Sequence, residues 1–598
     1  MLPPANSQAI LLGNFAGTAL DDIINGNGRY LWQETFKKNF KDKALEYCTC
    51  DDLNRKEDFR TAALRQTQNI QDIVTELFGD LHGDPKKPHK AGSFSREKAV
   101  LEPSFVCEQL GLQGRVDLMT TDFKLLVEQK SGNNYNIQTH QPNEYGSFQK
   151  EEHYVQLLLY YGVLRQNFRI SSHNIDMRLL YSKYPLPGGL VVVNFYQKLF
   201  REAIRLRNRI VANEFGFALN GFEGTTEALS ADILNERHLA TPFFFNYIQP
   251  RLDSVIEPLH RLTSLEKAYY ERMMTFVFRE QLAAKTGAQE GLGNSMADLW
   301  NMPLAVKKET GNIYTGLTIA RKAKSKQLNG YDIITLDVPD QGEDFLPNFR
   351  LGDMVYLYSY SPSEEPDVRK ALLFKGNLIE IHTDSVTIKT VNPIPKAGNV
   401  WAIEHSGSDI AATSAIRSLH QFVSSASSCR QLLLAQRAPE LDAAVQLTRS
   451  YHPTYDPLLL KAFQAKDYFL LVGPPGTGKT SMALQFMVRE ALAKRQSILL
   501  MSYTNRAVDE ICGMLSDNAI DYIRIGNPYS CDKRYRSHLL TEYIEQHPNL
   551  NHIRLQLQSS QVIVGTTSTL QSKTYLFELK SFSMAIIDEA SQILEPHL

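Results

Sequence analysis

The sequence predicts an α/β protein of several domains, and three stretches of its 598 residues support this fold class. An apolar run over 468–472, a glycine-rich turn and the start of a helix follow one another, which is typical of a parallel α/β domain in which the run is a buried strand. Between 311 and 405, five short alternating segments separated by turns indicate a small antiparallel barrel. A strand, a turn and a strand over 100–132, followed by a helix, indicate a second α/β unit.

The composition is that of a globular protein with several hydrophobic cores. Hydrophobic residues make up 43% of the chain and charged residues 22%. We expect a cytoplasmic protein without membrane contact, because no stretch approaches the ~18 uncharged apolar residues of a membrane span and the first residues lack a basic signal segment. The six cysteines form neither a disulfide framework nor paired CxxC spacing. A net charge of −2 neither favours nor excludes nucleic-acid binding, since a local basic groove is sufficient.

Shifts in composition divide the chain into six regions. We expect, in order, an N-terminal region of unclear role (1–95), an α/β domain (96–225), a helical linker or stalk (226–310), the barrel (311–405), a second helical stalk (406–450) and a parallel α/β domain (451–598). In the first region, 58–78 has the apolar spacing of a helix. The helix expected over 196–213 is basic, and its arginines are either a solvated face or contacts to a DNA backbone.

The glycine-rich turn and the helix after it form a phosphate-binding loop. Glycines let backbone N–H groups close around phosphate oxygens, the lysine neutralises the terminal phosphates and the threonine binds Mg²⁺. A chance glycine-rich loop is the alternative, but strand, complete motif and helix occur together here. The predicted nucleotide-binding residues are Gly473, Pro474, Pro475, Gly476, Thr477, Gly478, Lys479 and Thr480.

A strand expected over 584–587 ends in a pair of carboxylates, Asp588 and Glu589. Such a pair places one carboxylate in the Mg²⁺ shell and the second where it can orient or deprotonate the attacking water. Together with the loop, the segments SYTNRAVDEI (502–511), RIG (524–526), VGTTSTL (564–570) and DEASQ (588–592) resemble the first RecA-like motor domain of superfamily 1B helicases. Another class of P-loop ATPase is the alternative.

The resemblance to these helicases implies specific contacts. ATP would bind with Mg²⁺ or Mn²⁺, Gln592 would contact the nucleotide, and Thr504 and Asn505 would contact nucleic acid. The barrel would help to grip that nucleic acid, unless it is only a spacer. The family usually reads adenine with a glutamine, and Tyr455 occupies that place here, which puts adenine selectivity in doubt.

Carboxylates and a lysine lie on the two strands expected within 114–130. Glu128 and Lys130 are two residues apart and point to one face, and Asp117 lies on the neighbouring strand. Two carboxylates on neighbouring strands can share a divalent cation, and the lysine can hold or polarise a water, which suits metal-assisted phosphodiester hydrolysis. Two solvent-exposed hairpin strands are the alternative.

The helix expected over 151–166 adds Gln156 and Tyr160, one turn apart on one face. A glutamate ahead of GLxGxxD, then ExK, then QxxxY, resembles the RecB-like branch of the PD-(D/E)XK nucleases. The resemblance implies that Mg²⁺ or Mn²⁺ is held by the acidic residues, that the lysine assists the water and that the glutamine and tyrosine position the strand. These residues are Glu102, Asp117, Glu128, Lys130, Gln156 and Tyr160. A degenerate nuclease fold kept as a DNA clamp is the alternative.

Three departures from these families shape the expectations. An upstream histidine ligand cannot be placed, since His82 and His89 fall in an expected loop. No cysteine follows Tyr160 before Cys429, so we expect no iron–sulfur cluster. The chain ends six residues after DEASQ, so the second RecA-like lobe is expected elsewhere and the chain is expected to be a fragment of a longer protein.

The whole chain thus resembles the nuclease-helicases of Okazaki-fragment processing. This resemblance implies an ATP-dependent 5′-to-3′ DNA helicase fused to a metal-dependent nuclease, acting on single-stranded DNA or single-stranded ends in replication or repair. The first alternative is an RNA or RNA–DNA helicase, similar to those of nonsense-mediated decay, whose nuclease fold only binds. The second is a module that binds nucleic acid and nucleotide without turnover.

Overall fold

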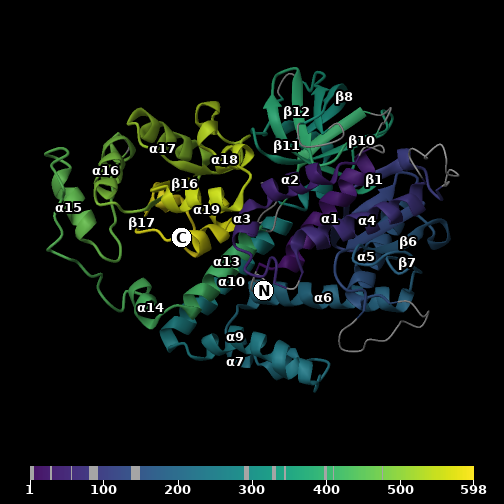
Figure 1. Cartoon of the computed structure of the whole chain (residues 1–598), viewed down its shortest axis with the longest axis horizontal. Coiled ribbons are helices and arrows are strands. Elements are labelled where there is room, and N and C mark those ends of the chain that lie inside the picture. Colours follow the sequence, from purple (N-terminus) through teal and green to yellow (C-terminus); the bar gives the residue numbers. More distant parts are fainter. Residues whose placement is uncertain are drawn as a thin grey trace.

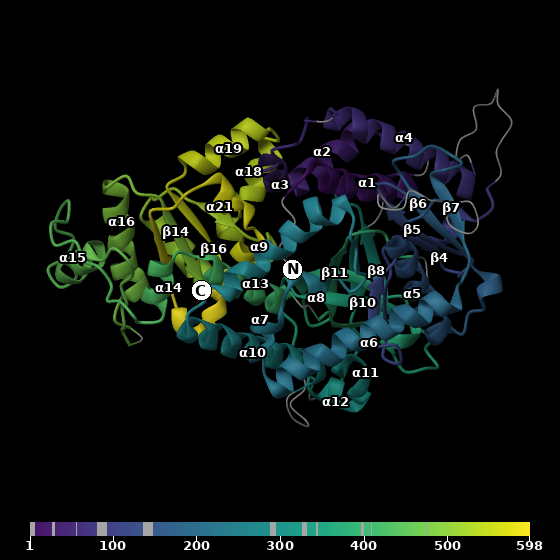
Figure 2. The same cartoon turned by 90° about the horizontal axis from the view of Figure 1, so that it is seen from below.

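The structure, a computed structural model of the chain, is shown in Figures 1 and 2. It describes residues 6–26, 30–55, 57–79, 92–135, 148–287, 295–325, 332–342, 345–395, 400–407, 410–474 and 476–598. A parallel-sheet domain lies at the left of Figure 1 and a five-stranded sheet with its helices at the right, with a barrel above. The mixed α/β class predicted from the sequence is confirmed.

The five-stranded sheet has the order β1-β4-β5-β6-β7. Strands β5 and β6 are parallel and are connected by α5 (Glu151–Phe168), while the other pairs are antiparallel. The helix, β4 and β5 overlap the ranges predicted from the sequence, whereas β1 was not predicted. The strands are β1 (Ala99–Leu101), β4 (Leu118–Thr120), β5 (Leu125–Lys130), β6 (Asp176–Tyr181) and β7 (Leu190–Val193). A hairpin of β2 (Ser104–Cys107) and β3 (Leu112–Arg115) stands beside the sheet.

Helices cover both faces of this sheet. Leu126 of β5 packs in one core with Leu157 and Leu158 of α5, whereas Leu125 and Val127 pack in another core with the N-terminal helices. Since successive strand residues point to opposite faces, α5 covers one face and the N-terminal helices cover the other. Helix α6 (Gln197–Asn220) packs outside α5.

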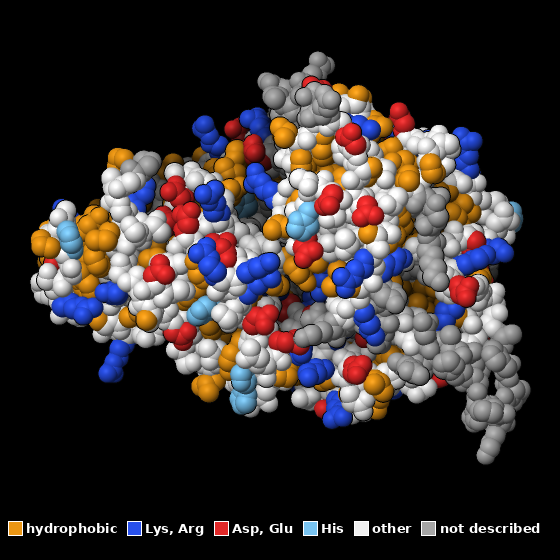
Figure 3. All heavy atoms as spheres, turned by 90° about the horizontal axis from the view of Figure 1, so that it is seen from above, with side chains coloured by type: hydrophobic (Ala, Val, Ile, Leu, Met, Phe, Trp, Pro, Cys, Tyr) orange, Lys and Arg blue, Asp and Glu red, His pale blue; other side chains and the backbone are white. Residues whose placement is uncertain are grey.

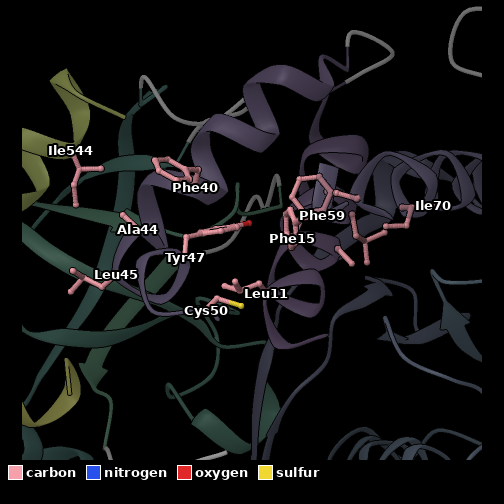
Figure 4. Close-up of a cluster of buried hydrophobic side chains, with 14 of the residues drawn as sticks. Leu11, Phe15, Phe40, Ala44, Leu45, Tyr47, Cys50, Phe59, Ile70 and Ile544 are labelled. Atoms are coloured by element: carbon pink, nitrogen blue, oxygen red, sulfur yellow. The ribbon is translucent and has the colours of Figure 1, made fainter. Parts of the chain in front are cut away.

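The described residues between 6 and 79 form a bundle of four helices that joins the two halves of the chain. The helices are α1 (Gln8–Asn25), α2 (Trp32–Asp42), α3 (Ala44–Cys48) and α4 (Phe59–Phe78), the last as predicted. Leu45 of α3 shares a core with Ile544, Leu557 and Leu576 of the parallel-sheet domain, and Figure 4 shows Ile544 beside Ala44 and Leu45. The Arg554 guanidinium donates to the Cys48 carbonyl oxygen at 2.6 and 3.1 Å.

The barrel is closed by six antiparallel strands in the order β10-β11-β12-β9-β8-β13. The sequence predicted the barrel and five of the strands. It missed β13, whose central residues are buried without the alternation that marks a half-exposed strand. The strands are β8 (Ile313–Ala323), β9 (Ile333–Asp337), β10 (Met354–Tyr360), β11 (Phe374–Ile381), β12 (Ser385–Thr390) and β13 (Val400–His405).

Helices connect these bodies along the lower side of Figure 1. The principal ones are α7 (Thr225–Ala228), α8 (Ala231–Leu234), α9 (Gln249–His260), α10 (Ser264–Thr286), α11 (Asp298–Asn301), α12 (Leu304–Glu309), α13 (Ile410–Ser424) and α14 (Ser427–Leu433). The prediction that helix continues to 450 is wrong, because α14 ends at Leu433. Beyond it, the chain is held by side chains, for example by Glu490, which accepts hydrogen bonds from Thr448 at 2.5 and 2.9 Å.

The parallel sheet has four strands in the order β15-β16-β14-β17. The last of them in the chain lies where the sequence predicted a strand over 584–587, and helices flank the sheet. The strands are β14 (Ile498–Ser502), β15 (Ile523–Ile525), β16 (Val562–Thr566) and β17 (Met584–Ile587). The helices include α15 (Asp456–Gln464), α16 (Gln485–Ala493), α17 (Asn505–Asp517), α18 (Leu540–Gln546), α19 (Leu550–Ser559), α20 (Thr567–Ser572) and α21 (Tyr575–Leu579).

The prediction of a buried strand over 468–472 is wrong. These residues form no strand, and Leu470 and Val472 are 77% and 92% exposed. The residues just before them are tied elsewhere: the Asp467 carboxylate accepts hydrogen bonds from the Arg437 guanidinium at 2.9 and 3.1 Å and from the Glu440 backbone at 2.8 Å. The start of this segment is therefore bound to the irregular chain after α14, and the segment does not pair with the edge of the sheet.

On the face shown in Figure 3, acidic and basic side chains are interspersed, and neither charge dominates. This fits the net charge of −2. Among the described residues, no helix is both long enough and apolar enough to cross a membrane.

Candidate functional site

Four of the predicted residues form one hydrogen-bonded network where α5 crosses the end of β5. The Lys130 Nζ donates to Glu128 Oε1 at 2.7 Å and to Gln156 Oε1 at 2.9 Å. The Gln156 amide nitrogen donates to Glu128 Oε1 at 2.7 Å and to the Tyr160 hydroxyl at 2.8 Å. The strand period places the carboxylate and the lysine on one face, and the helix period places the amide and the phenol above them.

Asp117 lies beside this network, and Glu102 lies next to it. The Gln129 backbone N–H donates to Asp117 Oδ2 at 2.7 Å, which ties this carboxylate to β5. The Glu102 backbone N–H donates to the Asp117 carbonyl at 3.1 Å, while its carboxylate faces Arg115 at 3.4 Å. The structure therefore brings five predicted residues together and places Glu102 at their margin.

The carboxylates of this cluster are held in a poorly solvated place. Burial and, after it, the Asp117 carboxylate raise the pKa of Glu128, and Lys130 lowers it, with a net pKa of about 7. Burial likewise raises the pKa of Asp117 and of Glu102. The Glu128 Oε2 is buried and accepts no hydrogen bond from any described residue. Crowded carboxylates with an unused oxygen favour a bound cation, which would offset their repulsion.

The donor set at this place suits a hard divalent cation held by few protein ligands. Asp117 and Glu128 supply carboxylate oxygens, which Mg²⁺ and Mn²⁺ prefer. Within the described ranges, no three histidine, cysteine or acidic side chains stand close enough together to hold a metal ion by themselves. A cation here would need water or substrate oxygens in addition, and the ligand role of Glu102 stays a prediction.

Two glycines of the GLxG segment have a packing reason. A Cβ at Gly114 would lie 2.6 Å from Cε1 of the Tyr160 ring, so the ring packs directly across this glycine. Gly111 has a φ of +56°, and its carbonyl accepts hydrogen bonds from the Arg207 guanidinium at 2.9 and 3.1 Å. Arg207 of α6 therefore holds the segment that precedes the site. The sequence showed a basic helix but gave no sign of this contact.

The phosphate-binding loop lies at the start of the helix that continues into α16. Gly476 and Gly478 have φ values of +80° and +76°, which only glycine adopts readily. The Lys479 Nζ donates to the Gly473 carbonyl, and the Thr480 hydroxyl donates to Asp588 Oδ2 at 3.0 Å. The loop lysine and threonine are thus paired within the site. Pro474 accepts a hydrogen bond from the Thr477 hydroxyl at 2.8 Å, and Pro475 lies outside the described residues.

The carboxylate pair after β17 faces this loop through Asp588. Glu589 is exposed with a φ of +54°, and Gln592 donates to its Oε2 at 3.4 Å. Tyr455 contacts the phosphate-binding loop: its hydroxyl donates to the Thr477 carbonyl at 2.9 Å. The two predicted nucleic-acid residues lie after β14: Thr504 caps α17 by accepting from the Ala507 N–H at 3.2 Å, and Asn505 is exposed.

Comparison with known proteins adds to this geometry. Residues 456–555 match the family described as an AAA domain. The chain is 36% identical over 138 residues to the DNA replication ATP-dependent helicase/nuclease JHS1 of Arabidopsis thaliana, a match that covers 23% of this chain and 10% of that protein. The chain is similar to helicase/nucleases of DNA replication.

Two further relatives have the same description. The Homo sapiens DNA replication ATP-dependent helicase/nuclease is 37% identical over 138 residues, covering 23% of this chain and 13% of that protein. The Saccharomyces cerevisiae protein is 29% identical over 180 residues, covering 28% of this chain and 11% of that protein. The similarity predicted from the motifs is confirmed. The matches span only 10% to 13% of the length of these three relatives.

Proposed function

We propose that this chain binds ATP at its phosphate-binding loop and cleaves single-stranded DNA at the β5–α5 cluster, as an ATP-dependent DNA helicase with a metal-dependent nuclease domain that acts in replication or repair. The observation that supports cleavage best is the Glu128–Lys130–Gln156–Tyr160 network beside Asp117, with one buried carboxylate oxygen unused. The descriptions of the relatives support the same pairing of activities. We assign 96–225 to the PD-(D/E)XK nuclease fold, 226–310 and the helical part of 406–450, which ends at Leu433, to the stalk, and 451–598 to the first RecA-like lobe.

At the proposed nuclease site, the side chains keep oxygens that can bind a metal ion and hydrogens that can be donated to water or phosphate. Asp117 and Glu128 would hold Mg²⁺ or Mn²⁺, which supplies Lewis-acid polarisation of the phosphate when bound. Lys130 uses two of its three hydrogens on Glu128 and Gln156, so the third is available to hold the attacking water. The Tyr160 hydroxyl accepts from Gln156, so its own hydrogen is available to a phosphate oxygen. Burial raises the pKa of Tyr160 to about 12, which keeps that hydrogen in place.

At the nucleotide site, binding requires one exchange of partners. Lys479 would leave the Gly473 carbonyl for the terminal phosphates, since a charged acceptor forms the stronger hydrogen bond. Thr480 and Asp588, already in contact, would hold Mg²⁺ or Mn²⁺, and Glu589 would orient the attacking water. The arginines of a second RecA-like lobe, which the resemblance implies, would complete the site for hydrolysis.

The test of this function is cleavage of end-labelled single-stranded DNA by the purified chain with Mn²⁺ or Mg²⁺. Lys130→Ala should abolish cleavage while leaving DNA binding in place. Lys124→Ala is the matched control, because Lys124 precedes the same strand but is exposed and outside the network. DNA binding without cleavage by the wild-type chain would replace the nuclease with a nucleic-acid clamp. A requirement for 2′-hydroxyls in binding would favour an RNA substrate.

A further inference from the structure

A histidine that the predicted motifs do not include lies on the same side of α5 as the nuclease network. His153 precedes Gln156 by three residues and Tyr160 by seven, so all three share one face of the helix. Along the helix axis, it lies about 4.5 Å from Gln156 and about 10 Å from Tyr160. Below it is Tyr181 of β6, which is the register partner of Lys130 in the parallel pair.

The hydrogen bonds around Tyr181 fix the state of this imidazole. The Lys150 backbone N–H donates to the Tyr181 hydroxyl at 3.2 Å, and the His153 Nδ1 lies 3.1 Å from the same oxygen. The hydroxyl has a single hydrogen, and giving it to Nδ1 satisfies all three groups. The ring hydrogen of the neutral histidine is then on Nε2.

The surroundings keep the ring neutral. Burial first, and then the Lys130 and Lys150 charges, lower the pKa of His153 while Glu152 raises it, with a net pKa of about 4. The side chain is only partly buried, and none of the described residues accepts a hydrogen bond from its Nε2. His153 therefore presents one fixed, uncharged N–H donor on the active-site face of α5.

We propose that His153 is a further substrate-binding residue of the nuclease site, whose Nε2–H donates to a non-bridging oxygen of the phosphate next to the one that is cleaved. This inference rests on the proposed function, because it takes the DNA strand to lie along the row Tyr160, Gln156, His153. The spacing along α5 places His153 beyond the network that surrounds the reacting phosphate. A neutral donor suits this place, since it adds a phosphate contact without adding repulsion against Lys130.

The alternative is purely structural: His153 would serve only to accept the Tyr181 hydrogen and to fix the first turn of α5. The two roles predict different effects of a chemical change in the DNA on its binding to the chain. A methylphosphonate replaces one non-bridging oxygen by a methyl group and removes the charge of a single phosphate. A contact from Nε2 makes binding sensitive to this replacement at one position, and a structural role does not.

The experiment measures the binding of single-stranded oligonucleotides to the full chain with Ca²⁺ in place of Mn²⁺, so that the DNA stays intact. His153→Phe keeps an aromatic ring against Tyr181 but has no donor, His153→Ala is a second variant, and Tyr181→Phe removes the hydroxyl alone. We expect both His153 variants to weaken binding on the order of tenfold. A methylphosphonate at one position should weaken wild-type binding by a similar factor and leave binding by the His153 variants unchanged.

The outcomes separate this inference from the proposed function. Equal sensitivity of wild type and His153 variants to every methylphosphonate would overturn the contact, as would binding by His153→Phe that is as tight as binding by wild type. If the wild type binds with the expected pattern but never cleaves with Mn²⁺, the contact stands and the nuclease proposal fails. If the wild type cleaves, and His153→Phe binds and cleaves as well as the wild type, the nuclease proposal stands and the His153 contact fails.

Discussion

Replacing Gly114 by alanine should disable the proposed nuclease site through Tyr160 alone. The added Cβ would lie 2.6 Å from Cε1 and 3.0 Å from Cδ1 of the Tyr160 ring. Carbon atoms in contact prefer about 3.5 to 4.0 Å, so the ring has to move by roughly 1 Å. A shift of that size lengthens the 2.8 Å hydrogen bond from Gln156 to the Tyr160 hydroxyl beyond hydrogen-bond distance.

The expected losses of rate and stability follow from the displacement of the Tyr160 ring. A misplacement of about 1 Å in a catalytic arrangement can reduce the rate about 100-fold, and overpacking of this kind costs about 1 to 3 kcal/mol of stability. The assay is the initial rate of single-stranded DNA cleavage with Mn²⁺ for Gly114→Ala. Gly216→Ala in α6 is the matched control, because an added Cβ there meets no atom within 4 Å.

A double variant tests the route of the effect. If Gly114→Ala acts by displacing Tyr160, then adding it to Tyr160→Ala should cost nothing more, because the ring that it displaces is already gone. Cleavage by Gly114→Ala at the rate of Gly216→Ala would refute the reasoning. A further loss in the double variant would show that the glycine acts on another part of the β2–β3 hairpin.

Three further predictions concern other parts of the chain. Lys479→Ala should remove ATP binding, measured by calorimetry, without changing single-stranded DNA cleavage. Arg554→Ala loses both hydrogen bonds to the Cys48 carbonyl, so amide exchange in α3 and α19 should rise while exchange in β5 stays unchanged. The lowered pKa of His153 means that the unfolded chain binds more protons than the folded chain between pH 6.5 and about 4, so stability falls as the pH falls through this window. The urea midpoint of wild type should therefore drop between pH 7 and pH 5 relative to that of His153→Phe.

The sequence was most informative where chemistry depends on local periodicity. Glu128 and Lys130 share a face because of the strand period, and Gln156 and Tyr160 do so because of the helix period. Hydrophobic packing then brings the two faces together: Leu126 of β5 lies in one core with Leu157 and Leu158 of α5, so the helix lies over the strand. Residue spacing therefore sufficed to predict which residues share a face, and the resemblance to the nucleases implied that the two faces meet.

Features that depend on distant parts of the chain were not predictable in this way. The strand expected over 468–472 has the right composition, but its place is decided by Asp467 and the segment after α14. The role proposed for His153 depends on Tyr181, which lies 28 residues away at the end of β6. Nothing in the first 79 residues indicates that α3 packs against helices of the opposite end of the chain.

The bundle of the first four helices also sets the order in which the protein can fold. Cys48 and its partner Arg554 are 506 residues apart, and Leu45 packs with Leu557 and Leu576. At roughly 5 to 20 residues per second, the ribosome needs about 25 to 100 s to make that partner after α3. During this time, the apolar side of α3 remains uncovered on a growing chain. The packing of α3 against α19 and α21 is therefore a late step of folding, and chaperones that bind apolar helices can bind α3 before it.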